Sequence, residues 1–150
     1  MLITCPTFLI LDVVGNFMTM NKIVEIIKVQ ETDKFEGTVT FDVDGRQYVA
    51  FYWGDNFRVG EKVNVTLTQL EHPLKWEKIF TKNKGREIKI EKSKDSECTY
   101  DCYGQIKSIN PIIADFGDLQ FELGDWTSDG NVIGEYIFWA IDRLEIKRTE

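Results

Sequence analysis

The chain has 150 residues, of which 43% are hydrophobic and 29% charged, and this balance excludes an intrinsically disordered protein. Its formal net charge of −7 argues against nucleic acid as a partner, because affinity for phosphate depends on Lys and Arg. Aromatic residues make up 13% of the chain, and together with many branched residues they favour β-structure.

The first twenty residues, MLITCPTFLILDVVGNFMTM, are apolar but resemble neither a signal peptide nor a membrane span. They lack a basic start, and Asp12 interrupts the apolar run. We treat residues 1–20 as an N-terminal extension with two open interpretations. Either translation begins at Met20 and the preceding residues are not part of the native protein, or residues 8–14 (FLILDVV) add a strand to the body.

Four runs in the first half alternate with period two, as half-buried strands do: KIVEIIKV (22–29), GTVTFDV (37–43), RQYVAFYW (46–53) and VNVTLTQL (63–70). The pair Asp44–Gly45 between two of them predicts a tight hairpin. The alternation predicts that Val49, Phe51 and Trp53 face the core. Tyr48 and Tyr52 are therefore expected on the outer face of the same strand.

Residues 75–94 link the two halves and are basic. Two short β-patterned runs, 75–80 and 86–91, flank a predicted turn at residues 83–85, so we expect a hairpin here. Between residues 82 and 94, six bases (Lys82, Lys84, Arg86, Lys89, Lys92, Lys94) against Glu87 and Glu91 give 6 − 2 = +4. From residue 95 to 142 the balance reverses, with ten acids and one base giving −9.

The second half repeats the pattern of the first. Residues 49–55 (VAFYWGD) align with 119–125 (LQFELGD), residues 59–71 (VGEKVNVTLTQLE) with 133–145 (IGEYIFWAIDRLE), and Gly37 with Gly104. Hydrophobic positions agree in phase, so Leu119, Phe121 and Leu123 are also expected in the core. We predict an all-β fold of two tandem small OB-like β-barrel units formed by internal duplication, spanning residues 21–74 and 95–150. The alternative is a single β-sandwich.

The stretch GDWTSDGNVIGEY, residues 124–136, resembles a calcium loop because Asp125, Asp129 and Gly130 have suitable spacing. Its third position is Thr127 and its twelfth is Tyr136, neither of which meets the pattern, and we expect strands rather than helices around it. The first half carries the shorter counterpart GDNFRVGE. We therefore predict a turn with an insertion and no metal site.

Other chemistry finds little support in the sequence. The three cysteines (Cys5, Cys98, Cys102) are too few for a disulfide framework, and we expect structural thiols in a reducing cytoplasm. The single histidine, His72, precedes a proline and has no catalytic motif around it. We expect neither an enzyme nor a cofactor, and the sequence does not predict an oligomeric state.

The acidic second half predicts a protein-binding module that neutralises a basic partner, as an inhibitor or immunity protein of a nuclease does. Trp126 and Phe138 are expected to be exposed aromatic anchors among the acids. The predicted partner-binding residues are Asp115, Asp118, Glu122, Asp125, Trp126, Asp129, Phe138 and Asp142. The alternative is that these acids only keep the surface soluble.

Binding of single-stranded nucleic acid by an OB-like face is the alternative function. In it, Tyr48 and Tyr52 would stack on bases from the outer side of their strand, and the basic linker would contact phosphate. The residues for this alternative are Tyr48, Tyr52, Lys82, Lys84 and Arg86.

Overall fold

A computed structural model describes residues 12–14, 17–71, 76–94 and 96–149. Most of these residues lie in strands, in one ten-stranded sheet rather than the two facing sheets of a sandwich. The elements are β1 (Asp12–Val14), β2 (Phe17–Asp33), β3 (Glu36–Val43), β4 (Arg46–Trp53), β5 (Lys62–Glu71), α2 (Trp76–Thr81), β6 (Lys89–Lys92), β7 (Tyr100–Ser108), β8 (Ile112–Asp115), β9 (Gln120–Gly124), the 3-10 turn η1 (Gly130–Val132) and β10 (Tyr136–Arg148).

Strands β2 to β5 confirm the four runs predicted in the first half. Asp44 and Gly45 make the predicted hairpin turn between β3 and β4, with positive φ angles of 51° and 90°. Strand β2 is continuous through Met20, which pairs with Leu67. Of the predicted N-terminal strand 8–14, only β1 lies within the described residues, and it pairs with the start of β2.

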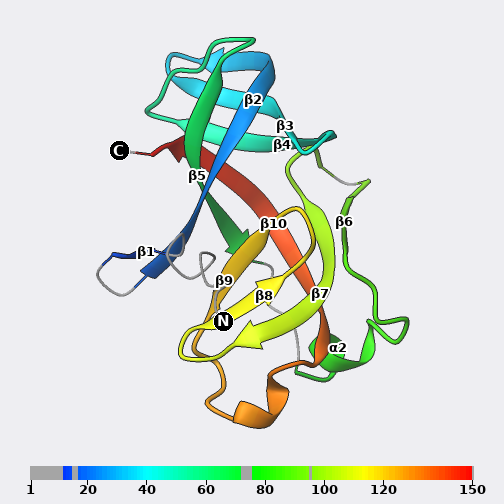
Figure 1. Cartoon of the computed structure of the whole chain (residues 1–150). Helices are drawn as coiled ribbons and strands as arrows, with labels where there is room; N and C mark the ends of the chain where they lie inside the picture. The colour runs from blue at the N-terminus through cyan, green and yellow to red at the C-terminus, as the bar shows by residue number, and fades with distance from the viewer. Residues whose placement is uncertain (1–11, 15–16, 72–75, 95, 150) are drawn as a thin grey trace.

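The first half is a Greek key closed by a strand from the second half. Strands β2, β3 and β4 form a meander, and β5 returns to pair with β2, in the order β5-β2-β3-β4. Strand β10 then pairs antiparallel with β5 and parallel with β4, where Glu145 lies opposite Phe51. Five strands thereby close a ring, with β10 crossing from the other half of the molecule (Figure 1).

The second half follows the same strand order. Strands β7, β8 and β9 form a meander, and β10 returns to pair with β7, in the order β10-β7-β8-β9. The first part of β10 pairs with β7 and its last part pairs with β5. Strand β10 is therefore shared between the two halves.

The core is continuous through both halves, because inward side chains of the ring meet those of β7 to β10. Two tyrosines join the halves through their hydroxyls. The Tyr48 hydroxyl donates to Asp118 Oδ2 at 2.5 Å, and Tyr100 of β7 bonds the backbone N–H and C=O of Val49. Tyr100 thus occupies the edge of β4 at a position where β10 does not reach.

The prediction of which β4 side chains face the core is wrong. Tyr48 and Tyr52 are buried at 4% and 2% exposure, whereas Trp53 is 67% exposed and Phe51 also lies on the outer face. Both faces of this strand carry large apolar residues, so alternation alone does not choose between them. The tyrosines face the core because Asp118, distant in sequence, accepts a hydrogen bond from the buried hydroxyl of Tyr48.

Residues 75–80 are not a strand within the described part, because α2 begins at Trp76. This helix buries Ile79 and is followed by the predicted turn and by β6, which pairs with β7. Helix α2 and the turn after it lie against β10, and Phe138 is buried at 3% exposure rather than exposed as predicted. The Lys82 ammonium lies 4.1 Å from the centre of its ring.

The predicted correspondence between the two halves is matched at some positions and not at others. Backbone bonds link Ile26 to Gly60 and Glu61 in the first half, and Ile106 to Gly134 and Glu135 in the second, in the same pattern. Leu119, Phe121 and Leu123 are buried as predicted, but their counterparts on β4 face outward. Gly37 and Gly104 do not correspond, because they lie on β3 and β7, which differ in place within the strand order.

Candidate functional site

A cleft of about 510 Å³ opens on the outer face of the ring, where β4 and β10 part. The two parallel strands pair at Phe51 and Glu145 only, and then diverge toward their ends. Strand β5 contributes Thr68 on the far side of β10. The lining consists of Phe51, Trp53, Gly54, Asp55, Thr68, Glu145, Ile146, Lys147 and Arg148.

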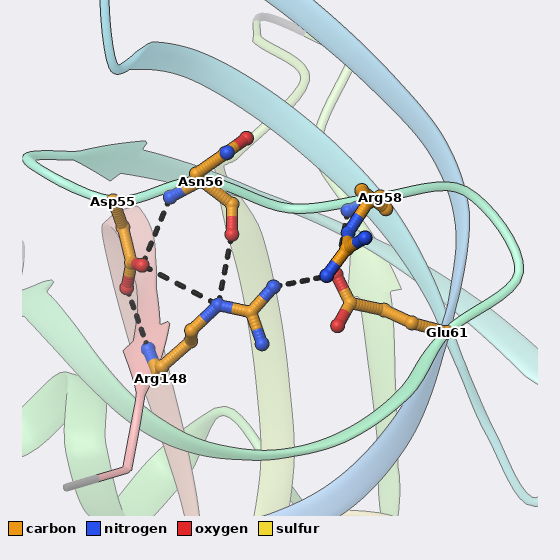
Figure 2. A network of polar contacts seen from close by, with 5 residues as sticks. All are labelled: Asp55, Asn56, Arg58, Glu61 and Arg148. Atoms are coloured by element: carbon orange, nitrogen blue, oxygen red, sulfur yellow. Dashed lines mark hydrogen bonds and ion pairs between the residues drawn. The ribbon is translucent and has the colours of Figure 1, made fainter.

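An ion-pair network closes the far end of this cleft and fixes the loop between β4 and β5. Arg148 at the end of β10 donates its backbone N–H to Asp55 at 2.7 Å and reaches Glu61 Oε2 with its guanidinium at 2.6 Å (Figure 2). Its Nε also donates to the carbonyl of Asn56 at 2.8 Å. The hydrogen bond from Arg148 lowers the pKa of the Glu61 carboxyl.

Two exposed aromatic residues lie next to this cleft. Trp53 ends β4, and the backbone N–H of Gly54 donates to the carbonyl of Phe35 at 2.7 Å, so the two aromatic positions are adjacent. Phe35 is 47% exposed in the turn between β2 and β3. Phe51 is already covered, because the guanidinium of Arg143 lies 4.4 Å from its ring centre.

Exposed carboxylates lie on the strands next to these two aromatic positions. Asp33 and Glu36 are in cross-strand register with Trp53, and Glu31 lies in the next register row, opposite Gly37. Within the described residues none of the three forms an ion pair, and Lys34, over the ring of Phe35, is the one base in this turn. We call the set Glu31, Asp33, Phe35, Glu36 and Trp53 the aromatic–acidic edge.

The acids predicted as the partner-binding surface are mostly engaged in local structure. Asp118 accepts from Tyr48 and lies 3.7 Å from Arg46, at the contact between the halves. The Glu122 carboxylate accepts from the Gly124 N–H at 2.5 Å. Asp115 likewise accepts from Gly117, and Asp142 lies apart from the others, beside Thr99. Most of the set is therefore occupied by bonds within the protein's own structure.

The two predicted aromatic anchors are not free for a partner. Trp126 stacks on Trp139 with ring centres 6.0 Å apart and meets the edge of Phe80. Phe138 lies between Lys82 and Tyr103, as described for β10. Both aromatics therefore pack within the second half.

The loop that resembled a calcium site contains η1. Asp129 caps this turn by accepting the N–H of Asn131 at 2.9 Å, and Asp125 is exposed. Among the described residues, no group of three or more His, Cys, Asp or Glu side chains is placed to hold a metal ion. His72 and Cys5 lie outside those residues.

The residues predicted to bind nucleic acid do not form one surface either. Tyr48 and Tyr52 are buried and cannot stack on bases, and burial raises the pKa of both phenols. Lys84 and Arg86 line a second cleft in the other half of the molecule. The outward aromatics of β4 are instead Phe51 and Trp53, a pair that the sequence pattern had assigned to the core.

The buried thiols of Cys98 and Cys102 are poor nucleophiles. Burial raises the pKa of Cys98 to about 11 and raises that of Cys102 as well, so both remain protonated at neutral pH. Both are free cysteines. Their environment is that of structural residues.

Comparisons of this chain with family models, with curated proteins and with solved structures found no match. No helix among the described residues is long and apolar enough to cross a bilayer.

Proposed function

We propose that the protein is a non-enzymatic binding module that captures a cationic protein, in the manner of an inhibitor or immunity protein acting on a basic nuclease. The aromatic–acidic edge is the contact surface. The observation that carries this proposal is the side-by-side placement of Phe35 and Trp53, both exposed, among three exposed carboxylates. A cytoplasmic location belongs to the same proposal, since Cys98 and Cys102 are buried thiols suited to a reducing compartment.

Interface energetics support this surface. Trp is enriched among residues that dominate binding energy, and rim charges set the rate and the choice of partner. A large exposed ring contributes little to the stability of the free protein, so its exposure has a cost in solubility that binding would offset. The net charge of −7 steers a cationic protein toward such a surface.

The finer architecture is proposed on similar grounds. We infer that the two halves are OB-like units related by duplication. Supporting this are the closed five-stranded ring, the shared Greek-key order, and the matching backbone bonds of Ile26 and Ile106. The differing orientation of β4 and β9 is then a divergence between the copies.

A nona-arginine peptide is a suitable probe, with binding followed by isothermal titration calorimetry and association followed by stopped-flow fluorescence. The variant Asp33→Lys/Glu36→Lys is compared with Asp125→Lys/Asp129→Lys, which alters the loop predicted from sequence. Each double variant changes the net charge by the same amount, from −7 to −7 + 4 = −3. Bulk electrostatics is therefore matched between them.

We expect the edge variant to lose about tenfold in affinity and in association rate, and the loop variant to lose much less. Trp53→Ala should also weaken binding about tenfold, whereas Val59→Ala, an apolar residue of similar exposure, should not. Equal losses in the two charge variants would reject the edge as the site. Tighter binding of oligo(dT) than of the peptide, dependent on Trp53, would favour the nucleic-acid alternative instead.

A further inference from the structure

The second half carries a polar cleft of about 420 Å³ that the proposed partner surface does not use. It opens between the turn after α2, strand β7 and the loop before β10. The residues that line it are Phe80, Asn83, Lys84, Arg86, Gln105, Gly134, Glu135 and Tyr136.

A buried amide holds this turn in place. Asn83, 5% exposed, donates its side-chain N–H groups to the carbonyls of Glu87 and Ile137, each at 3.0 Å, and of Gly104 at 3.4 Å. Its side-chain oxygen accepts the N–H of Glu87 at 2.7 Å. The turn is thus tied to both β7 and β10. The two basic residues that follow Asn83 are therefore presented at the cleft by a rigid support.

Lys84 and Arg86 are both exposed, and within the described part of the chain neither forms an ion pair. Arg86 has a φ of 53°, a left-handed conformation that costs energy for a residue with a Cβ. Its guanidinium lies 5.8 Å from the centre of the Tyr136 ring, which limits where it can point. Carboxylates elsewhere neutralise Arg143 and Arg148, but not these two cations.

The remaining polar groups of the cleft are oriented as well. Gln105 donates its side-chain N–H to the carbonyl of Gly134 at 3.0 Å and accepts from Lys107 at 2.8 Å, so a third cation lies beside the lining. Glu135 is the one acid of the lining, and it is exposed. The lining therefore carries two bases against one acid, and its margin adds Lys107 and Glu87, on a protein with a net charge of −7.

We propose that this cleft binds a phosphate-class oxyanion of small size, with Lys84 and Arg86 as its charged ligands. A compact oxyanion suits two cations that line one cleft better than a carboxylate side chain does, because it offers several acceptor oxygens. The volume accommodates a phosphate group together with part of the molecule that carries it. This site is independent of the aromatic–acidic edge.

The test is an amide chemical-shift titration of the whole protein in phosphate-free buffer with inorganic phosphate, adenosine monophosphate and adenosine. Both phosphate-bearing probes should shift the amides of Gly85 and Gly134 with dissociation constants of about 1 mM or below, and adenosine should not. Tighter binding of adenosine monophosphate would identify a phosphomonoester as the ligand, and equal binding would identify the free anion.

Variants make the assignment specific. Lys84→Ala and Arg86→Gln should each weaken binding about five- to tenfold, and Lys28→Ala, an exposed lysine of the first half, should not. Glu135→Gln should strengthen binding, a result that a change in folding would not produce. Absence of saturable shifts at 20 mM phosphate (roughly twenty times the expected constant) would overturn the proposal, as would unchanged affinity in both cation variants.

Discussion

Two glycines mark places where neighbouring strands approach too closely for any side chain. A Cβ on Gly104 would lie 2.2 Å from the carbonyl oxygen of Asp115 and 2.5 Å from the ring of Phe116. A Cβ on Gly37 would lie 2.2 Å from the carbonyl oxygen of Gln30. Both contacts involve backbone, which cannot move without disturbing a ladder. Glycine is required at these positions for space rather than for a special φ angle.

Gly104→Ala should therefore destabilise the protein by about 2–4 kcal/mol, since the added methyl group must displace β8 or the buried Phe116 ring. Gly130→Ala is the matched control, because a Cβ there meets no atom within 4 Å. Urea unfolding followed by circular dichroism measures both. A loss below about 0.5 kcal/mol in Gly104→Ala would contradict the close approach.

At this scale the sequence predicted burial well where only one face of a strand is apolar, as at Leu119, Phe121 and Leu123. It failed at β4, where Tyr48 and Trp53 compete for the core, because the deciding contact with Asp118 depends on tertiary structure. The residue types did indicate which face is buried. A buried tyrosine can satisfy its hydroxyl with a hydrogen bond, whereas an exposed tryptophan beside an acidic turn is typical of a binding surface.

Among the elements, the strands of the first half were predictable because alternation and the Asp44–Gly45 turn are local signals. The pairing of β10 with β4 was not predictable, since the two strands are far apart in sequence and meet at a single register position. Helix α2 was missed because six residues give too short a periodicity to distinguish a helix from a strand.

The end of β10 depends on Arg148, which gives a prediction at this scale. Arg148→Met should lower the free energy of unfolding by about 1–2 kcal/mol at pH 7, because the partly buried carboxylates of Asp55 and Glu61 lose their partner. Lys147→Met, a neighbouring exposed cation, should cost less than about 0.5 kcal/mol. Chemical unfolding at fixed pH compares the two.

The effect of Arg148→Met should depend on pH. The folded protein holds the pKa of Glu61 below its ordinary value of 4.5, so this stabilisation is complete above that pH and is lost as pH falls through the lower folded pKa. The difference between wild type and variant should therefore shrink below about pH 4.5. A difference that stays constant from pH 7 to about pH 3, well below the unfolded pKa, would argue against the pairing.

For the molecule as a whole, the linear charge asymmetry of the sequence is partly cancelled on folding. Strand β6 brings Lys89 and Lys92 alongside β7, and α2 and its turn lie against β10, so the basic segment covers part of the acidic half. The sequence located the acidic residues correctly but not their neighbours. For this reason the acidic surface predicted from sequence is not the aromatic–acidic edge proposed from the structure.

Because β10 completes the ring of the first half, that half should not fold alone. A fragment of residues 17–94 is expected to show no cooperative unfolding, and the full chain should unfold in a single transition. Far-UV circular dichroism reports all strands, while in a Trp53→Phe/Trp76→Phe background the fluorescence of Trp126 and Trp139 reports the second half. Midpoints that differ between the two probes, or a cooperative fragment, would show that the halves are independent.

The sharing of β10 also bears on how such a molecule can be assembled. Strands β5 and β10 pair antiparallel, with Gln69 opposite Leu144 and Leu67 opposite Ile146, so each strand begins in one half and ends against the other. In two separate chains, this pairing would be a subunit interface formed along the last strand of each. On one chain the same pairing is intramolecular, so its two sides cannot dissociate and its stability does not depend on protein concentration.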